Sequence, residues 1–356
     1  MGQSYNFEAL ASDPSLLLYD IDFERFEAKF YYAKPGLTAK HCGEVLKNKP
    51  VCQISLRRLF EETNILDIPL PKPINIIWIT EYTGSTLFAN ALHATSTFHL
   101  YNETAVFARL SMGFRAALFG KFSCALTDMK KIAKLVLFFQ SKTSHPCQTA
   151  LVKEWPLSSL IAPYLLDADE QVRGIFYYAN LEDFLTACTH RPIRLEIAKS
   201  RLIKRFSEVK SMPALAKISL ENRTLGEYAA IFWLAILYTH QQPALRDHAR
   251  IKTLHNETFF SSPADTLYEA SAFFGKAITK ELAEKISRGS VFSHHAKQPH
   301  RAFSNFARKE ILKVEQIRNR QQIDEGLAIA DKILSKFPLD GISCQALFKK
   351  GSNQDE

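Results

Sequence analysis

The sequence predicts an α/β fold, a three-layer domain with a mainly parallel sheet. Buried strands are expected at residues 74–80 (INIIWIT), 149–155 (TALVKEW) and 172–179 (VRGIFYYA). The first is a continuous apolar run rich in β-branched residues, which is typical of a central parallel strand buried on both faces. Helical patterns follow at 85–94 and 181–190. This alternation of strand and helix indicates a parallel sheet covered by helices.

The segments on either side of this alternation predict a small N-terminal module and a helical C-terminal part. Apolar and charged residues alternate over 16–33, which indicates one or two half-buried strands, and short helices are expected at 38–49 and 54–64. The stiff connector PLPKP (69–73) is the best boundary. We therefore expect domains at 1–72, 73–310 and 311–356, the last a charged helix followed by a tail.

The chain becomes helical from about residue 192. The segment 193–210 carries a basic face, interpreted as solvated or, alternatively, as a contact for an anionic glycan or a membrane surface. Residues 227–240 are apolar enough for a buried helix. The stretch 287–310, SRGSVFSHHAKQPHRAFSNFARKE, is basic, aromatic and punctuated by Gly and Pro. It predicts a functional loop and not a helix.

Composition limits the classes of function. The net charge of +8 over 356 residues suits an anionic partner, although a merely solubilising charge explains it equally well. Six scattered cysteines without a CxxC pair argue against a zinc site and a disulfide framework, so no metal is expected. The sequence shows no signal peptide, and its longest apolar run, 229–238, is about half of a membrane span. We therefore expect a cytoplasmic protein without a transmembrane segment, and no nucleic-acid partner.

The loop after the first predicted strand has the features of an anion site. In ITEYTGSTLFANAL (79–92), a strand runs into a glycine turn and then into a helix. Free amides at the start of a helix, together with its dipole, attract anions. Gly84 would allow close approach of a phosphate, and Ser85 and Thr86 carry hydroxyls. A nucleotide hydrolase loop would need a second glycine and a lysine. The loop has neither, and Glu81 adds a negative charge.

Further segments follow this loop in a recognisable order. They are LYNETAVF (100–107), TALVKEWPLSS (149–159), GIFYYANLEDFLTAC (174–188) and IKTLHNETFFSSPADTLYEASAFFG (251–275). Together with the T-G-S-T-L of the loop, their order and spacing resemble the sulfotransferase family over roughly residues 73–310. The resemblance implies a P-loop-type fold, a 3′-phosphoadenosine 5′-phosphosulfate donor and no metal.

The resemblance also implies roles for individual residues. The 5′ end of the donor would be held by the loop residues Tyr82, Thr83, Gly84, Ser85, Thr86 and Leu87. The late basic segment would close over the nucleotide through Arg288, His295, Lys297 and Arg301. Lys153 would assist transfer, and Glu103 would act as the base, with His99 or His93 as alternatives. Where the family carries an Arg and a Ser for the 3′-phosphate, this chain has Ala179 and Ala187.

These observations predict a divergent, sulfotransferase-like enzyme. It would move a sulfuryl group directly from the donor to a hydroxyl or amine, without a covalent enzyme intermediate. Two alternatives stay open: a P-loop-type transferase with another anionic donor, and a non-catalytic protein that binds an anionic glycan or lipid on the same fold. The acceptor, whether glycan, lipid or small molecule, is not indicated by the sequence.

Overall fold

The computed structural model describes residues 6–13, 15–32, 50–118, 126–143, 145–156, 158–242, 245, 248–339 and 347. The predicted helix at 38–49 lies outside these residues. Among those described, the predicted fold class is confirmed: five strands form one sheet in the order β5-β6-β4-β7-β8. The pairs β4–β6 and β5–β6 are parallel.

The sheet contains the three predicted strands and two others. The predicted ones are β4 (Ile74–Ile79), β6 (Thr149–Lys153) and β7 (Val172–Tyr178). Every residue of β4 and β6 is buried, as a continuous apolar run predicts for an interior strand. The sequence did not single out β5 (Phe98–Asn102) and β8 (Ile251–His255) as strands. Both lie at the ends of the strand order.

The chain divides into two compact units that interleave along the sequence. Unit 1 comprises residues 1–77 and 92–174, and unit 2 comprises residues 78–91 and 175–356. Such a division does not show which segment folds alone. The domain boundaries expected after residues 72 and 310 therefore stay predictions.

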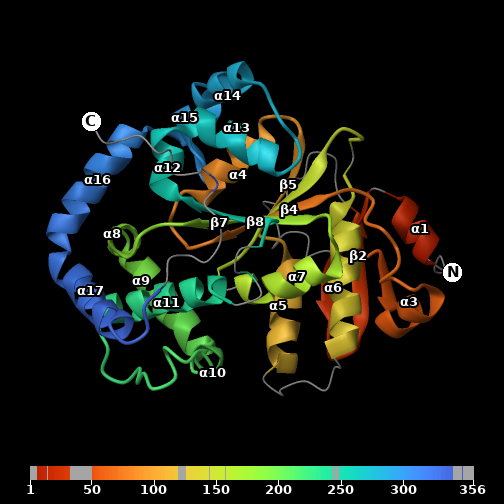
Figure 1. Cartoon of the computed structure of the whole chain (residues 1–356), viewed down its shortest axis with the longest axis horizontal. Coiled ribbons are helices and arrows are strands. Elements are labelled where there is room, and N and C mark those ends of the chain that lie inside the picture. The colour runs from red at the N-terminus through yellow and green to blue at the C-terminus, as the bar shows by residue number, and fades with distance from the viewer. Residues whose placement is uncertain are drawn as a thin grey trace. The chain divides into compact units, whose positions relative to one another are not determined.

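Unit 1 contains an antiparallel sheet in the order β1-β2-β3. Its strands are β1 (Leu16–Asp22), β2 (Glu27–Tyr32) and β3 (Cys52–Ser55), so both strands expected over 16–33 are present. Helices α5 and α6 contact each other and β1 (Figure 1). The helices of this unit are α1 (Phe7–Ser12), α3 (Leu56–Glu62), α5 (Ala105–Leu118), α6 (Leu126–Ser141), the 3₁₀ turn η1 (Ser158–Ile161) and α7 (Ala162–Ala168).

Unit 2 is organised around the buried helix α11 (Leu225–His240). A capping box of Thr224 and Glu227 begins this helix. It packs against α17 (Arg320–Leu334), α9 (Pro192–Lys204) and α8 (Leu181–Thr189) (Figure 1). The other helices are α4 (Ser85–His93), α10 (Phe206–Val209), α12 (Asn256–Ser261), α13 (Pro263–Phe273), α14 (Lys280–Ser287), α15 (Ser290–Ser293) and α16 (Asn305–Arg318).

The prediction that residues 287–310 are an irregular loop is wrong in part. The segment contains α15, a hairpin of β9 (His294–His295) and β10 (Gln298–Ala302), and the first turns of α16. These strands are too short to display a period of two in the sequence. The charged C-terminal segment, predicted as one helix, forms two helices. Asn319 interrupts it, as the C-cap of α16 and the N-cap of α17.

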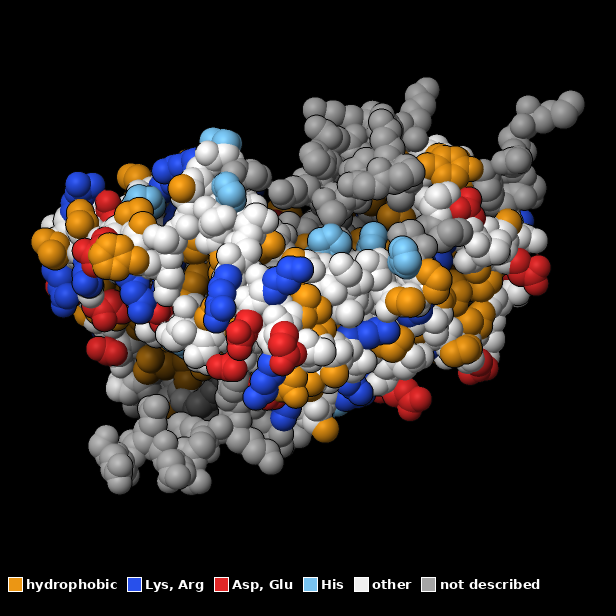
Figure 2. Space-filling model, turned by 90° about the horizontal axis from the view of Figure 1, so that it is seen from above, with side chains coloured by type: hydrophobic (Ala, Val, Ile, Leu, Met, Phe, Trp, Pro, Cys, Tyr) orange, Lys and Arg blue, Asp and Glu red, His pale blue; other side chains and the backbone are white. Residues whose placement is uncertain are grey.

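The positive charge is not concentrated on the face shown in Figure 2. Lys and Arg side chains there are interspersed with Asp and Glu. Among the described residues, no helix combines the length and apolarity needed to cross a membrane.

Candidate anion-binding site

The loop between β4 and α4 is held in a tight, fixed conformation. Its backbone turns through two residues of positive φ, Tyr82 (+60°) and Gly84 (+85°). The Thr80 amide donates to the carbonyl of Tyr177 at 3.0 Å, and the Thr83 hydroxyl donates to the carbonyl of Thr80 at 3.0 Å. Neighbouring β7 and the loop's own side chains thus fix the direction in which α4 begins.

The start of α4 offers hydrogen-bond donors to a ligand. The amides of Ser85 and Thr86 have no acceptor among the described residues, as expected for the first turn of a helix. Neither hydroxyl bonds to a described residue, although both side chains are buried at 5–6% exposure. Unused donors on a nine-residue helix suit an anion.

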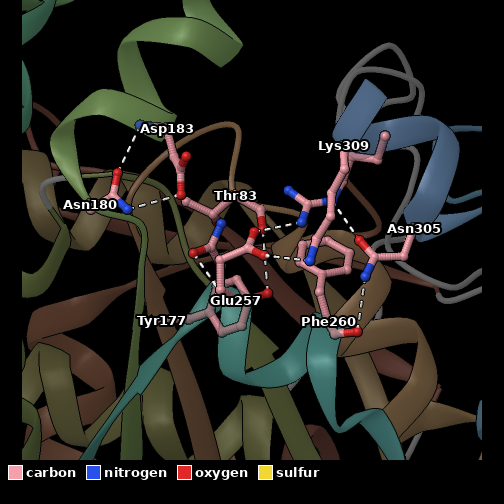
Figure 3. A network of polar contacts seen from close by, with 10 residues as sticks. Thr83, Tyr177, Asn180, Asp183, Glu257, Phe260, Asn305 and Lys309 are labelled. Atoms are coloured by element: carbon pink, nitrogen blue, oxygen red, sulfur yellow. Dashed lines mark hydrogen bonds and ion pairs between the residues drawn. The ribbon is translucent and has the colours of Figure 1, made fainter. Parts of the chain in front are cut away.

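Gly84 has a second, purely structural reason to be glycine. A Cβ atom here would lie 2.5 Å from Cζ of Phe260. Arg308 also contacts the Phe260 ring, and its guanidinium lies 3.9 Å from the ring centroid. The same guanidinium pairs with Glu257. The Asn305 amide donates to the carbonyl of Phe260 at 3.1 Å (Figure 3). The glycine therefore serves packing whether or not an anion binds.

Two arginines of α9 contact the loop, and the sequence analysis missed their role. Arg201 pairs with Glu81, and the Arg194 guanidinium lies 4.7 Å from the centroid of the Tyr82 ring. Positions 194 and 201 are seven residues apart, so they share one face of the helix. Burial raises the pKa of Tyr82 to about 12, so its hydroxyl stays protonated. The loop has no cation in its own sequence, but two arginine side chains of α9 contact it.

The two alanines at the family's 3′-phosphate positions are buried and engaged through their backbone. The amide of Ala179 donates to the Thr80 hydroxyl at 3.1 Å, and its carbonyl accepts from Trp233 at 3.0 Å. The carbonyl of Ala187 accepts a hydrogen bond from Arg194 at 2.6 Å. A guanidinium from α9 therefore contacts the backbone of the α8 position at which the resemblance expects an anion-binding side chain.

The β9–β10 hairpin brings further cations to the same region of unit 2. Burial lowers the pKa of His295, and the positive charges of Arg301, Arg191, Arg194 and Lys297 lower it further. The charges that act on His295 therefore include Lys297 and Arg301 of the predicted set, Arg191 at the N-cap of α9, and Arg194 of α9. Arg288 is not among these charges: it pairs with Glu284 at 3.3 Å, and its side chain is 80% exposed.

The predicted catalytic residues Glu103 and Lys153 form an ion pair in unit 1. Their side chains are bonded, and the Glu103 amide donates to the carbonyl of Lys153 at 2.7 Å. Glu103 has a positive φ of 56°, which turns the chain sharply after β5. The Lys153 side chain is fully buried, whereas that of Glu103 is 25% exposed. Glu103 is therefore the member of the pair that a ligand can reach.

His99 is separated from this pair along the sheet. The β5–β6 register places His99 opposite Ala150 and Asn102 opposite Lys153. Three residues of strand correspond to roughly 10 Å. Burial, followed by the charges of His93 and Lys72, lowers the pKa of His99. His99 is therefore not part of the Glu103–Lys153 pair, and the roles predicted for Glu103 and His99 stay predictions.

A buried carboxyl beside the pair was also missed. Glu154 is 1% exposed, and its amide donates to the carbonyl of Ile77 at 3.0 Å. Burial raises the pKa of Glu154, and this effect outweighs the lowering by the hydrogen bond to the Trp155 amide and by the charge of Lys153. The resulting pKa is about 8. The only sequence signal is its place after a buried strand. Among the described residues, no group of three or more His, Cys, Asp or Glu could hold a metal ion.

No family profile and no curated protein matches the sequence. Among solved structures, the chain is similar to a sulfotransferase domain from the curacin biosynthetic pathway, with 14% identity and a TM-score of 0.38 over 78% of this chain and 96% of that chain. It is also similar to the sulfotransferase domain of the Synechococcus PCC 7002 olefin synthase, with 16% identity and a TM-score of 0.38 over 76% of this chain and 90% of that chain. A third similar structure is retinol dehydratase in complex with androsterone and inactive cofactor PAP, with 12% identity and a TM-score of 0.38 over 90% of this chain and 93% of that chain. Likenesses this distant do not assign an activity.

Proposed function

We propose that this chain is a sulfotransferase-like enzyme that takes a sulfuryl group from 3′-phosphoadenosine 5′-phosphosulfate. The observation that carries the proposal is the β4–α4 loop of unit 2. The backbone amides and the side-chain hydroxyls of Ser85 and Thr86 have no partner within the described residues. Arg194 supplies positive charge beside it, and Arg201 neutralises Glu81. Such a loop suits the phosphosulfate end of a nucleotide.

In this proposal the donor is held by the chain's own backbone and side chains. Residues 82–87 bind the 5′ end, while Lys297 and Arg301 of the hairpin neutralise further charge on the nucleotide and His295 donates a hydrogen bond to it. Arg288, paired with Glu284, stays a predicted ligand that would have to exchange this partner for the nucleotide.

Glu103 and Lys153 supply the proposed chemistry. The acceptor oxygen or nitrogen forms a bond to sulfur as the bond from sulfur to the phosphate oxygen breaks. The acceptor proton passes to Glu103, and adenosine 3′,5′-bisphosphate leaves. Lys153 stabilises negative charge as it develops. No metal is needed for these steps. A cytoplasmic location and a glycan, lipid or small-molecule acceptor belong to the same proposal.

Calorimetry with adenosine 3′,5′-bisphosphate tests the donor. We expect micromolar binding, weakened roughly 10-fold or more in Ser85→Ala, because a hydrogen bond to a charged group is worth about 1.5–3 kcal/mol. Ser335→Ala is the matched control, since that hydroxyl is exposed and donates to the Lys332 carbonyl on α17. Failure of the wild-type protein to bind this nucleotide would sink the proposal. Binding of another nucleotide or of a sulfated glycan instead would support one of the two alternatives.

A second measurement tests the base. Release of adenosine 3′,5′-bisphosphate from the donor is followed with a panel of hydroxyl and amine acceptors, with water as one member. Glu103→Gln should abolish release while leaving calorimetric affinity for the product nucleotide within about twofold. Persistent release in this variant would exclude Glu103 as the base.

A further inference from the structure

We propose that the outer face of helix α16 binds an anionic lipid surface. The α16 outer face is the side of the helix turned away from α8, against which α16 packs. Its large apolar side chains are Phe306, Ile311, Val314 and Ile317. This surface has no part in the proposed transfer of a sulfuryl group, so the inference is independent of the proposed function.

The polarity of α16 is the reverse of that of an ordinary surface helix. An ordinary helix turns an apolar stripe to the core and polar residues to solvent. In α16 the inner side is polar: Arg308 pairs with Glu257, and the Gln316 amide donates to the Glu182 carboxylate of α8. Glu315, also on this side, is buried. The inner side therefore holds α16 to unit 2 through polar contacts, and the core does not account for the apolar residues opposite.

Those apolar residues face solvent. Phe306 is 76% exposed and Ile317 is 79% exposed, and Ile311 and Val314 are exposed as well. Residues 306 and 317 are eleven positions apart, which is about three turns, so the two most exposed side chains lie in line along the helix. Val314 lies one turn before Ile317 on the same side. A continuous apolar surface of this kind indicates an interaction site.

The charge around the α16 outer face identifies an anionic partner. Residues 288–320 contain eight Lys and Arg and two Glu, a net charge of +6 out of the chain's +8. Lys309, Lys313 and Arg318 of α16 are exposed. Glu310 is paired with Lys313 at 2.9 Å. An amphipathic helix with this arrangement lies flat on a bilayer, with its apolar side chains at the acyl boundary and its cations at the phosphates of the headgroups.

A second copy of this chain fits the same face less well. Two copies joined through α16 would bring two segments of charge +6 together, and like charges repel. A helix of 14 residues is about 21 Å long, which is short for the whole interface of a stable dimer. A lipid surface has the opposite charge and requires no matching shape.

Flotation of the full chain with vesicles tests the inference. Vesicles of pure phosphatidylcholine are compared with vesicles that contain about 30% phosphatidylserine, whose charge attracts exposed cations. We expect binding to the anionic vesicles, weakened roughly 10-fold in Phe306→Ser and in Ile317→Ser, because each variant loses most of an apolar side chain. Lys313→Gln should weaken binding roughly fivefold. Ile193→Ser is the matched control, since this isoleucine is exposed on another basic helix, α9.

A second measurement reports contact with the lipid directly. Phe306→Trp should keep the binding, and its tryptophan emission should move to shorter wavelength on the anionic vesicles, because the ring leaves water. Emission that does not shift would overturn the inference. So would a wild-type chain that does not bind, equal binding to both kinds of vesicle, or binding that both serine variants of α16 retain.

Analytical ultracentrifugation without vesicles distinguishes the other occupant. The chain should be monomeric. A wild-type dimer that Ile317→Ser converts to a monomer would assign the α16 outer face to a second copy and overturn the lipid inference. Each of these outcomes leaves the proposed function untouched, because nucleotide binding is measured separately by calorimetry.

Discussion

Glu154 makes the stability of unit 1 depend on pH in a direction opposite to that of most carboxylates. Burial raises its pKa from the usual 4.5 to about 8. Below pH 4.5 the carboxyl is neutral in both the folded and the unfolded chain, so its stabilising contribution is fully present. Between pH 4.5 and 8 the unfolded chain releases the proton while the folded chain keeps it, and stability falls. Each pH unit corresponds to about 1.4 kcal/mol, which gives up to about 5 kcal/mol over the interval.

Replacing Glu154 by Gln tests this reasoning, because the amide has the same shape and does not titrate. Urea unfolding of both proteins at pH 5 to 9 should give nearly equal free energies of unfolding at pH 5. The variant should gain about 1.4 kcal/mol per pH unit up to pH 8 and then keep a constant advantage. The other titrating groups cancel in the difference, except for Lys153 and Glu103, whose charges act directly on Glu154. A difference that does not change with pH would refute the assignment of a neutral buried carboxyl.

Two further predictions concern the β4–α4 loop. Gly84→Ala should lower the free energy of unfolding by about 2–4 kcal/mol, because a side chain is strained at φ +85° and its Cβ would overlap Phe260. Gly84→Ala in a Phe260→Leu background should lose less, and an Ala variant as stable as the wild type would contradict this. Arg201→Gln should cost about 2 kcal/mol in urea unfolding, since it leaves Glu81 buried without a counterion. The double variant with Glu81→Gln should recover part of that loss, and additive losses in the double-mutant cycle would show that the pair is not coupled.

The interior of the sheet was predictable from sequence, and its edges were not. β4 and β6 have neighbours on both sides in the strand order, so every residue is buried and the sequence reads as an apolar run. β5 (FHLYN) and β8 (IKTLH) have one neighbour each, and their half-exposed residues include His, Lys and Asn. Five residues of mixed polarity carry too little periodicity to distinguish a strand from a loop.

The candidate site was predictable only where its residues are consecutive. Residues 82–87 form one loop, and a glycine between a strand and a helix predicts their arrangement locally. Arg194 and Arg201 reach that loop through tertiary packing of α9, which no local pattern shows. Their spacing of seven residues indicated a shared helical face, but a charged face on a helix is as compatible with solvent as with a buried contact. The Glu103–Lys153 pair was foreseen as two separate residues, and the sequence did not indicate their contact.

Charge at the loop is therefore decided by residues distant in the sequence. Read locally, ITEYTGSTL contains one carboxylate and no cation, which argues against an anion site. In the structure Glu81 is neutralised by Arg201, while Arg194 lies against Tyr82 and has no acidic partner among the described residues. Glu81 thus neutralises Arg201, one of the two arginines of α9 that contact the loop, while Arg194 keeps its positive charge uncompensated by a described carboxylate. Arg201 would add a second uncompensated positive charge only if Glu81 were replaced by a neutral residue. The anion affinity of this loop is expected to depend on helix α9 at least as much as on the glycine turn itself.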